Sequence, residues 1–296
     1  MQKKISTFGL YFLLSLLCFA LFSACSKKIP PKNETQDEYP HAIISLSPAA
    51  TEILFAIGAE KQIVAISDLS DYPPETQNLP KIGGFDGKTL SFEKILSFNP
   101  DFLYLTNGMH NFLIEQLQQN SIKYYLSDAT SVSKIFQEIL ELGEITGNQN
   151  QAKIVVQNMQ NQIENIKKNQ KNNPPAVYYE VWNEPFMSCG STSFINDIIT
   201  LSSGKNIFAQ LEQSYQIVSE ETIIASNPDF ILLPKSSLTS ANSVKLRNGW
   251  ENLNAVKNNQ IYIIDDDLLC RPGPRVTDSI QQLSDIFSKN TVFSAK

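Results

Sequence analysis

Charged side chains gather near the C-terminus, where two of the chain's three arginines lie four residues apart. Arg271 and Arg275 flank the stiff segment Pro272–Pro274, and three successive aspartates, 265–267, precede them. A planar guanidinium on such a loop can bind the amides, a carboxylate or a phosphate of a ligand. It can equally hold the loop in place by pairing with the aspartates. We favour this pairing for Arg275 and leave both roles open for Arg271. The three aspartates do not predict a calcium-binding loop, because they lack the alternating spacing of its ligands.

Enzyme signatures are incomplete in this sequence. Ser91-x-x-Lys94 and Ser131-x-x-Lys134 match one motif of penicillin-binding enzymes, but the Ser-Asp-Asn and Lys-Thr-Gly motifs that complete the set are missing. The chain also lacks Gly-x-Ser-x-Gly and the phosphate-binding loop. We therefore predict a protein that is not an enzyme.

Histidines are too few for a metal-ion binder, because such a site needs several imidazoles and the chain has only His41 and His110. We expect both to lie at the surface. The sequence thus predicts no metal site and no resident cofactor.

The composition is that of an ordinary globular protein, with 296 residues, 42% hydrophobic and 18% charged, and a net charge of −6. An acidic chain without a basic cluster is a poor candidate for binding nucleic acid or an anionic membrane surface. The length suits about two domains of roughly 100 to 150 residues.

The N-terminal residues 1–24 are typical of an export signal, with two lysines followed by an apolar run from Phe8 to Phe22. An uncleaved membrane anchor is the alternative, but this run is short for a span of roughly 20 residues. The sequence of Leu21–Cys25 resembles a bacterial lipobox, which predicts a lipoprotein signal peptide and a lipid on Cys25. The mature protein would be membrane-anchored outside the cytoplasm, in the periplasm or at the cell surface.

Residues 25–40 are polar and contain three prolines, and they predict a flexible tether. Cys18 leaves with the signal peptide and Cys25 carries the lipid, so Cys189 and Cys270 remain in the mature body. In an oxidising compartment this pair could form a disulfide. Two separate buried thiols are the alternative.

An internal repeat relates the two halves of the chain. Residues 90–105 align without gaps to residues 218–233 at a constant offset of 128, with eight of sixteen positions identical. Each copy predicts a short helix, a turn at Asn-Pro-Asp and a buried strand. The chain therefore predicts two lobes of one α/β design.

A second pair of strand–helix units supports this design. Residues 42–46 predict a strand followed by a helix that begins near Pro48, and residues 176–181 predict a strand followed by a helix capped by Ser193. The predicted fold is α/β, with two similar lobes whose central sheets are flanked by helices. We place the lobes at residues 41–149 and 174–296.

Residues 150–173 separate the lobes and predict a helix, because apolar side chains recur there at mostly helical spacing. A helix of about 20 residues within this segment spans about 30 Å. An ordinary surface helix is one interpretation, but its position between the repeats favours a long rigid helix that joins the lobes. The apolar side chains are Ile154, Val155, Met159, Ile163 and Ile166.

Three motifs carry a resemblance to a known family: the segment 44–52 with Ser-Pro-x-x-Thr-Glu, Ser-Asp-Tyr-Pro-Pro at 70–74, and Arg-Pro-Gly-Pro-Arg at 271–275. With the lipobox, the two lobes and the joining helix, they resemble the helical-backbone solute-binding proteins of ABC importers. Within that class they are similar to the cobalamin (vitamin B12) binding proteins. The resemblance implies a protein that binds a corrinoid as transported ligand and delivers it to an ABC permease dimer.

The resemblance also implies which residues face the ligand. A corrinoid is a wide ring with apolar edges and peripheral amides, so it needs aromatic surfaces and a few polar groups. Each aromatic side chain could instead fold back onto its own lobe. At Leu69 and Thr106 this sequence differs from the family, whose members can have aromatic residues at these two positions. The implied ligand-binding residues are Tyr72, Phe85, Trp182, Phe186, Tyr215, Asp267 and Arg271.

Glu93 and Glu221 occupy equivalent positions in the two copies of the repeat. The resemblance implies that one glutamate from each lobe meets arginines of a two-fold symmetric permease. Two exposed acids near helix N-termini are the alternative. A siderophore- or haem-binding protein of the same fold, and a lipid-anchored adhesion or assembly protein without a small ligand, remain the competing functions.

Overall fold

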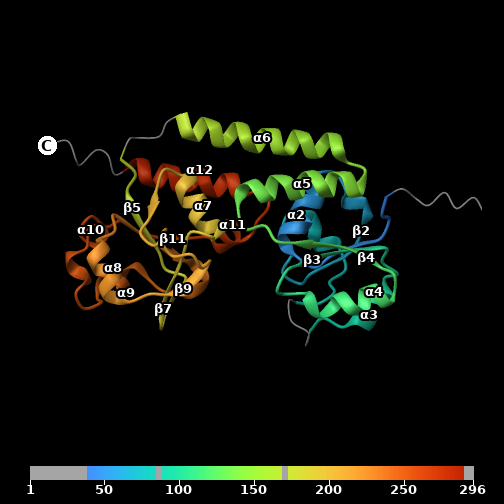
Figure 1. Ribbon diagram of the computed structural model, residues 1–296, viewed down its shortest axis with the longest axis horizontal. Coiled ribbons are helices and arrows are strands. Elements are labelled where there is room, and N and C mark those ends of the chain that lie inside the picture. The colour runs from blue at the N-terminus through green and yellow to red at the C-terminus, as the bar shows by residue number, and fades with distance from the viewer. Residues whose placement is uncertain (1–38, 85–88, 169–172, 290–296) are drawn as a thin grey trace, which may run out of the picture. The chain divides into compact units, whose positions relative to one another are not determined.

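The computed structural model describes residues 39–84, 89–168 and 173–289 (Figure 1). The predicted signal peptide, Cys25, most of the predicted tether and Phe85 lie outside these residues. Within the described part of the chain, no helix has both the length and the apolar character needed to cross a membrane.

The N-terminal lobe is built on a sheet of four parallel strands in the order β2-β1-β3-β4. Its strands are β1 (Ile43–Ser45), β2 (Ile63–Ile66), β3 (Phe102–Thr106) and β4 (Lys123–Ser127). Its helices are α2 (Pro48–Ala56), α3 (Phe92–Ser97), α4 (Ile114–Gln119) and α5 (Val132–Thr146), with short 3-10 helices η1 (Glu60–Gln62), η2 (Pro74–Asn78) and η3 (Asn111–Leu113).

The C-terminal lobe repeats this sheet with four parallel strands in the order β11-β10-β5-β8. Its strands are β5 (Ala176–Tyr179), β8 (Lys205–Asn206), β10 (Phe230–Pro234) and β11 (Ile261–Ile264). Its helices are α7 (Phe194–Leu201), α8 (Glu220–Ser226), α9 (Ala241–Lys245), α10 (Asn254–Lys257), α11 (Asp266–Cys270) and α12 (Val276–Lys289), with η4 (Lys235–Ser237) and η5 (Trp250–Asn252). An antiparallel sheet adds β6 (Trp182–Asn183), β7 (Phe186–Cys189) and β9 (Tyr215–Ile217).

The two parallel sheets have the same topology, because the order β2-β1-β3-β4 is repeated as β8-β5-β10-β11. The α/β fold with two similar lobes is therefore confirmed.

The two copies of the repeat fold alike in detail. Asn99 and Asn227 both adopt the left-handed backbone conformation that ends the short helix, with φ of 47° and 42°. Asp101 then accepts a hydrogen bond from the backbone N–H of Ala42 (3.0 Å), and Asp229 accepts one from the N–H of Ala176 (2.9 Å). Each Asn-Pro-Asp turn thus ends a helix and fixes the start of the neighbouring strand.

Helix α6 (Gln149–Lys168) packs against α5 of the N-terminal lobe and α12 of the C-terminal lobe (Figure 1). Its buried face belongs to a core cluster that also contains residues of both parallel sheets. Met159, Ile163 and Ile166 are buried as predicted, but Ile154 is 52% exposed, so it does not belong to this face. The apolar contact is instead made by Ala152 and Val156, which continue the alternating four- and three-residue spacing of one helical stripe with the other three.

Candidate functional site

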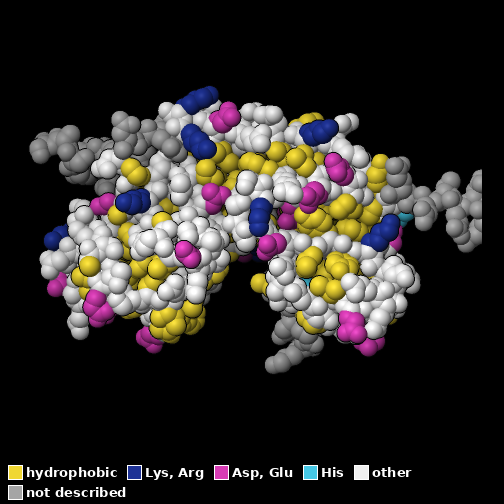
Figure 2. All heavy atoms as spheres, in the orientation of Figure 1, with side chains coloured by type: hydrophobic (Ala, Val, Ile, Leu, Met, Phe, Trp, Pro, Cys, Tyr) yellow, Lys and Arg dark blue, Asp and Glu magenta, His cyan; other side chains and the backbone are white. Residues whose placement is uncertain are grey.

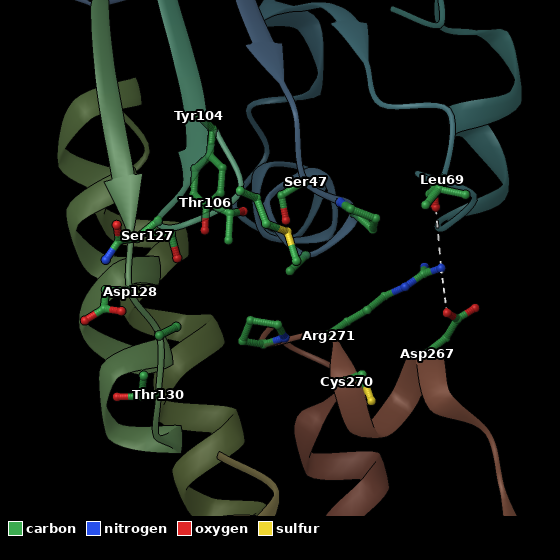
Figure 3. Close-up of a pocket in the computed structure, with 16 residues that line it drawn as sticks. Ser47, Leu69, Tyr104, Thr106, Ser127, Asp128, Thr130, Asp267, Cys270 and Arg271 are labelled. Carbon is green, nitrogen blue, oxygen red and sulfur yellow. Dashed lines mark hydrogen bonds and ion pairs between the residues drawn. The ribbon is translucent and has the colours of Figure 1, made fainter. Parts of the chain in front are cut away.

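A cleft of about 510 Å³ opens at the carboxyl ends of β1, β3 and β4. Ser47, Thr106 and Ser127, which stand at or just after these strand ends, line it. Ligands of parallel α/β sheets bind at this edge, because the connecting loops converge there. The opposite wall comes from the C-terminal lobe, through the end of α11 and the residues directly after it (Figure 3). Both lobes therefore contribute to one cleft.

A buried carboxylate holds the sheet side of the cleft in place. Glu138 of α5 is 2% exposed, and it accepts hydrogen bonds from the hydroxyls of Tyr104 and Ser127 (2.7 Å from Ser127 Oγ). Burial raises the pKa of Glu138, although the two hydroxyls partly oppose this shift. The Tyr104 ring stacks on Tyr125, with centroids 5.7 Å apart. The floor of the cleft is thus a packed, hydrogen-bonded surface.

The Ser-Pro-x-x-Thr-Glu motif organises the edge of the cleft. Thr51 Oγ1 lies 3.1 Å from both the carbonyl oxygen of Ser47 and Ser70 Oγ. Ser70 Oγ is also 2.8 Å from Ser67 Oγ, so a buried chain of hydroxyls links α2 to the loop after β2. These side chains satisfy one another rather than a ligand.

Arg271 crosses the cleft from the C-terminal lobe and meets acidic groups of both lobes. Its Nη1 atom lies 2.6 Å from Asp71 Oδ1 and 3.4 Å from Glu52 Oε1. Its Nη2 atom lies 2.7 Å from Asp267 Oδ1 and 3.4 Å from the carbonyl oxygen of Leu69 (Figure 3). Hydrogen bonding to Arg271 lowers the pKa of Asp71. Arg271 therefore fulfils the pairing role, and Asp267 is one of its partners.

Arg275 has a different partner from the one we predicted. Its Nε and Nη2 atoms lie 2.8 and 2.6 Å from the two carboxylate oxygens of Glu52, on α2 of the other lobe. The guanidinium also lies 4.1 Å from the centre of the Tyr72 ring. Glu52, hydrogen-bonded to Arg275, raises the pKa of the arginine. Arg275 does hold its loop. The prediction that it pairs with the aspartates 265–267 was wrong, because its hydrogen bonds go to the carboxylate of Glu52, which lies 223 residues earlier in the sequence.

The predicted ligand-facing residues fall into separate groups. Asp267 and Arg271 line the cleft, whereas Tyr72 is not among its lining residues and lies against Arg275. Phe186 folds back onto its own lobe, with its ring centre 5.7 Å from that of Trp250. Phe85 lies outside the described residues.

Trp182 and Tyr215 lie on the small antiparallel sheet and are 52% and 46% exposed. Met187 is the cross-strand partner of both Trp182 and Ile217, and Ile217 is 59% exposed. Because cross-strand partners share a face of a sheet, these apolar side chains form one exposed platform. Figure 2 shows apolar side chains gathered over this end of β7.

Sequence reasoning missed several residues that line the cleft, among them Asn107, Met109 and Asp128. Their signal was their position just after the ends of strands β3 and β4. Leu69 and Thr106, singled out only as departures from a family pattern, also line the cleft. Asp128 points away from Arg271 and pairs with Lys134 at 3.3 Å (Figure 3).

His110 is buried, which contradicts the surface position expected for it. Its Nδ1 atom accepts a hydrogen bond from the backbone N–H of Thr106 (2.9 Å), and burial lowers its pKa to about 4. The imidazole therefore fixes the end of β3. Within residues 39–84, 89–168 and 173–289, no cluster of three or more acidic, histidine or cysteine side chains could hold a metal ion.

Cys189 and Cys270 are both free thiols in the structure, so the disulfide considered from the sequence is not formed there. Cys189 is buried, and its sulfur accepts from Asn206 Nδ2 at 3.6 Å. Cys270 is exposed and lines the cleft.

Glu93 and Glu221 both lie exposed in the first turns of α3 and α8. Ser91 Oγ donates a hydrogen bond to Glu93 (2.6 Å), which lowers the pKa of this carboxyl. The adjacent Glu220 instead accepts a hydrogen bond from Trp250 Nε1 (2.7 Å), so it has a structural role that Glu221 lacks.

Comparison with known proteins agrees with this architecture. Residues 43–268 match the family model described as periplasmic binding protein. An uncharacterised ABC transporter substrate-binding lipoprotein of Bacillus subtilis is 28% identical over 85% of this chain and 81% of its own. A vitamin B12-binding protein of Vibrio cholerae is 29% identical over 81% of this chain and 87% of its own.

Solved structures give the same picture. The periplasmic vitamin B12 binding protein of Vibrio cholerae has a TM-score of 0.71 and 28% identity, covering 84% of this chain and 97% of that one. The periplasmic haem binding protein of the same organism has a TM-score of 0.75 and 25% identity, covering 83% and 98%. Similarity in fold therefore extends to proteins with different ligands.

Proposed function

The chain belongs to the periplasmic binding protein family, and we propose from this premise that it captures cobalamin or a related corrinoid and delivers it to an ABC import permease. Binding proteins of this family are not enzymes, so the function lies in the cleft. Relatives named as vitamin B12-binding support the corrinoid.

The charge of the cleft carries the proposal. Arg271 is the only Lys or Arg among the described residues that line it, and carboxylates of both lobes already surround this guanidinium. A ligand with free carboxylates would find no available cation among the lining residues that the structure describes. A corrinoid instead presents amides and a broad apolar face, which suit the mostly apolar lining and its few hydroxyl and amide groups.

The exposed platform of Trp182, Met187, Tyr215 and Ile217 offers a second apolar surface for such a ring. In this proposal Trp182 and Tyr215 contact the corrin, as the sequence resemblance implies, together with Tyr72, Phe85 and Phe186. Among these residues Phe186 has the least support as a ligand contact, because its ring packs against Trp250.

Haem is the second candidate ligand, since a haem binder shares the fold. Met109 and Tyr104 line the cleft and belong to residue types that ligate haem iron. Tyr104, however, donates its hydroxyl to Glu138. Haem would also bring two propionates to a cleft whose one described cationic side chain, Arg271, is already paired with carboxylates.

Calorimetric titration of the purified protein tests the ligand. Cyanocobalamin should bind with one-to-one stoichiometry, and cobinamide, which lacks the nucleotide loop, shows whether that loop contributes. Haemin and a ferric siderophore serve as competitors. Saturable haemin or siderophore binding without corrinoid binding would refute the corrinoid and leave the transport role.

We assign Glu93 and Glu221 to docking on the permease, since equivalent exposed acids on two lobes suit a symmetric basic partner. Glu93→Ala combined with Glu221→Ala should weaken ligand-stimulated ATP hydrolysis by the transporter and keep ligand affinity. A control pair, Glu115→Ala with Glu212→Ala, removes the same charge from exposed positions outside the repeat. Equal coupling in both double variants would refute the assignment.

The export signal and Cys25 complete the proposal. Lipidation of Cys25 would keep the protein at a membrane outside the cytoplasm, near its permease. Cys25→Ser should abolish incorporation of labelled fatty acid and release the protein from the membrane fraction. Labelling that persists in this variant would place the lipid elsewhere.

A further inference from the structure

We infer that Asp71 sets the charge preference of the cleft: by neutralising Arg271 from the opposite lobe, it favours an uncharged, amide-bearing ligand over its carboxylate analogue. This inference rests on the proposed function, because it concerns which corrinoids the cleft accepts. It assigns to Asp71 a role in specificity.

The geometry places Asp71 at the decisive position. Its Oδ1 atom lies 2.6 Å from Arg271 Nη1, which is the shortest of the three ion-pair distances around this guanidinium in the described part of the chain. Asp267, four residues before Arg271 in the sequence, pairs with the other terminal nitrogen, Nη2. Glu52 is 3.4 Å away and is already held by Arg275. Among these carboxylates, Asp71 alone reaches Arg271 from across the cleft without being shared with another arginine.

Charge explains the preference. A ligand carboxylate near Arg271 would meet the negative charges of Asp71 and Asp267 at close range, and it would have to displace one of them to gain the cation. A ligand amide has no such conflict, since its N–H can donate to a carboxylate and its carbonyl can accept from the guanidinium. The arrangement therefore discriminates between two groups of almost equal size.

Asp71 is also the partner whose replacement should disturb the fold least. Its side chain is 65% exposed, whereas those of Glu52 and Arg271 are 2% and 13% exposed. Replacing it by Asn keeps the shape and a hydrogen-bond acceptor, and it leaves no buried group without a partner. Hydrogen bonding to Arg271 lowers the pKa of Asp71, so the charge is present at neutral pH.

The test compares Asp71→Asn with the wild type. The control Glu75→Gln removes one negative charge from an exposed position four residues away. Each protein is titrated with cyanocobalamin and with the derivative in which one peripheral propionamide is hydrolysed to a carboxylate, and separately with haemin. The readout is the ratio of the two corrinoid dissociation constants.

The wild type and Glu75→Gln should prefer the amide by at least about tenfold, and Asp71→Asn should lower this preference by about tenfold, the effect expected of one charge-assisted hydrogen bond. A ratio in Asp71→Asn that stays within about twofold of the wild-type ratio would overturn the inference, as would an equal change in Glu75→Gln.

The haemin titration separates this inference from the proposed function. If no corrinoid binds but haemin does, the proposed ligand is wrong. Tighter haemin binding by Asp71→Asn than by the wild type would then still support the role of Asp71, and equal binding would overturn it. Failure of both ligands to bind any of the three proteins would overturn both.

Discussion

The buried ion pair between Glu52 and Arg275 joins the two lobes, and Glu52→Gln tests what this contact contributes to stability. The Glu52 side chain is 2% exposed and that of Arg275 is 20% exposed. Removing one partner of a buried pair costs about 3 to 5 kcal/mol, because the remaining charge is left in a poorly solvated site. Gln keeps one acceptor oxygen and Arg275 is partly solvated, so we expect a loss of about 2 to 3 kcal/mol.

Urea unfolding measures this loss, and thermal unfolding should show a Tm lower by about 5 to 10 °C for a chain of this size. The matched control is Lys134→Gln, which breaks the exposed pair with Asp128, whose side chains are 48% and 60% exposed. Such surface pairs contribute about 0 to 1 kcal/mol.

A double-mutant cycle with Arg275→Gln isolates the pair itself. The combined variant should lose at least about 1 kcal/mol less than the sum of the single variants, because the second change removes a charge that has already lost its partner. If Glu52→Gln destabilises the protein no more than Lys134→Gln does, or if the two single effects add, then this contact does not stabilise the junction between the lobes.

Three other features of the structure can be tested one residue at a time. Ser219→Ala removes the hydroxyl that accepts a hydrogen bond from the first turn of α8, so it should lower the unfolding free energy by about 1 kcal/mol, and an unchanged urea midpoint would contradict this. Iodoacetamide should alkylate the exposed Cys270 of the native protein and spare Cys189, whose burial raises its pKa to about 12; mass spectrometry of the peptides would reveal the opposite pattern if the burial is wrong. Arg271 lowers the pKa of Asp71 below the ordinary 3.8, so their pairing stabilises the fold at neutral pH. This stabilisation is lost as the pH falls below 3.8 and through the lowered pKa, because Asp71 then becomes protonated. The difference in Tm between wild type and Asp71→Asn should therefore shrink in that acidic range, and a difference that grows would refute the pairing.

The fold was predictable because its determinants are local. The repeat at 90–105 and 218–233 carries its own capping serine, its left-handed asparagine and its strand, so each copy specifies its helix, turn and strand without reference to distant residues. The joining helix was predictable for a similar reason, although one apolar residue, Ile154, points to solvent. When the apolar residues of a helix are few, their spacing does not decide which residues at the edge of the buried stripe face the core.

The cleft was less predictable because its contacts join residues far apart in the chain. The spacing of Arg271 and Arg275 suggested a held loop, but nothing in the sequence identified Glu52, more than 200 residues earlier, as the common partner. Trp182 and Phe186 illustrate the same limit at short range. They lie in one hairpin, yet one is exposed and the other packs on Trp250, and this outcome depends on the register of the hairpin.

The two lobes are alike in their sheets and differ in the loops after their strands, and this contrast bears on the proposed function. Features that the repeat conserves within the chain, including Glu93 and Glu221, lie on matching helices and suit a partner that is itself symmetric. The corrinoid that we propose has no such symmetry. The cleft has none either, because one lobe offers strand ends and Asp71 and the other offers Arg271 on the loop after α11. Substitutions at the repeated positions should therefore affect delivery to the permease, whereas substitutions at the unmatched loops should affect which ligand is held.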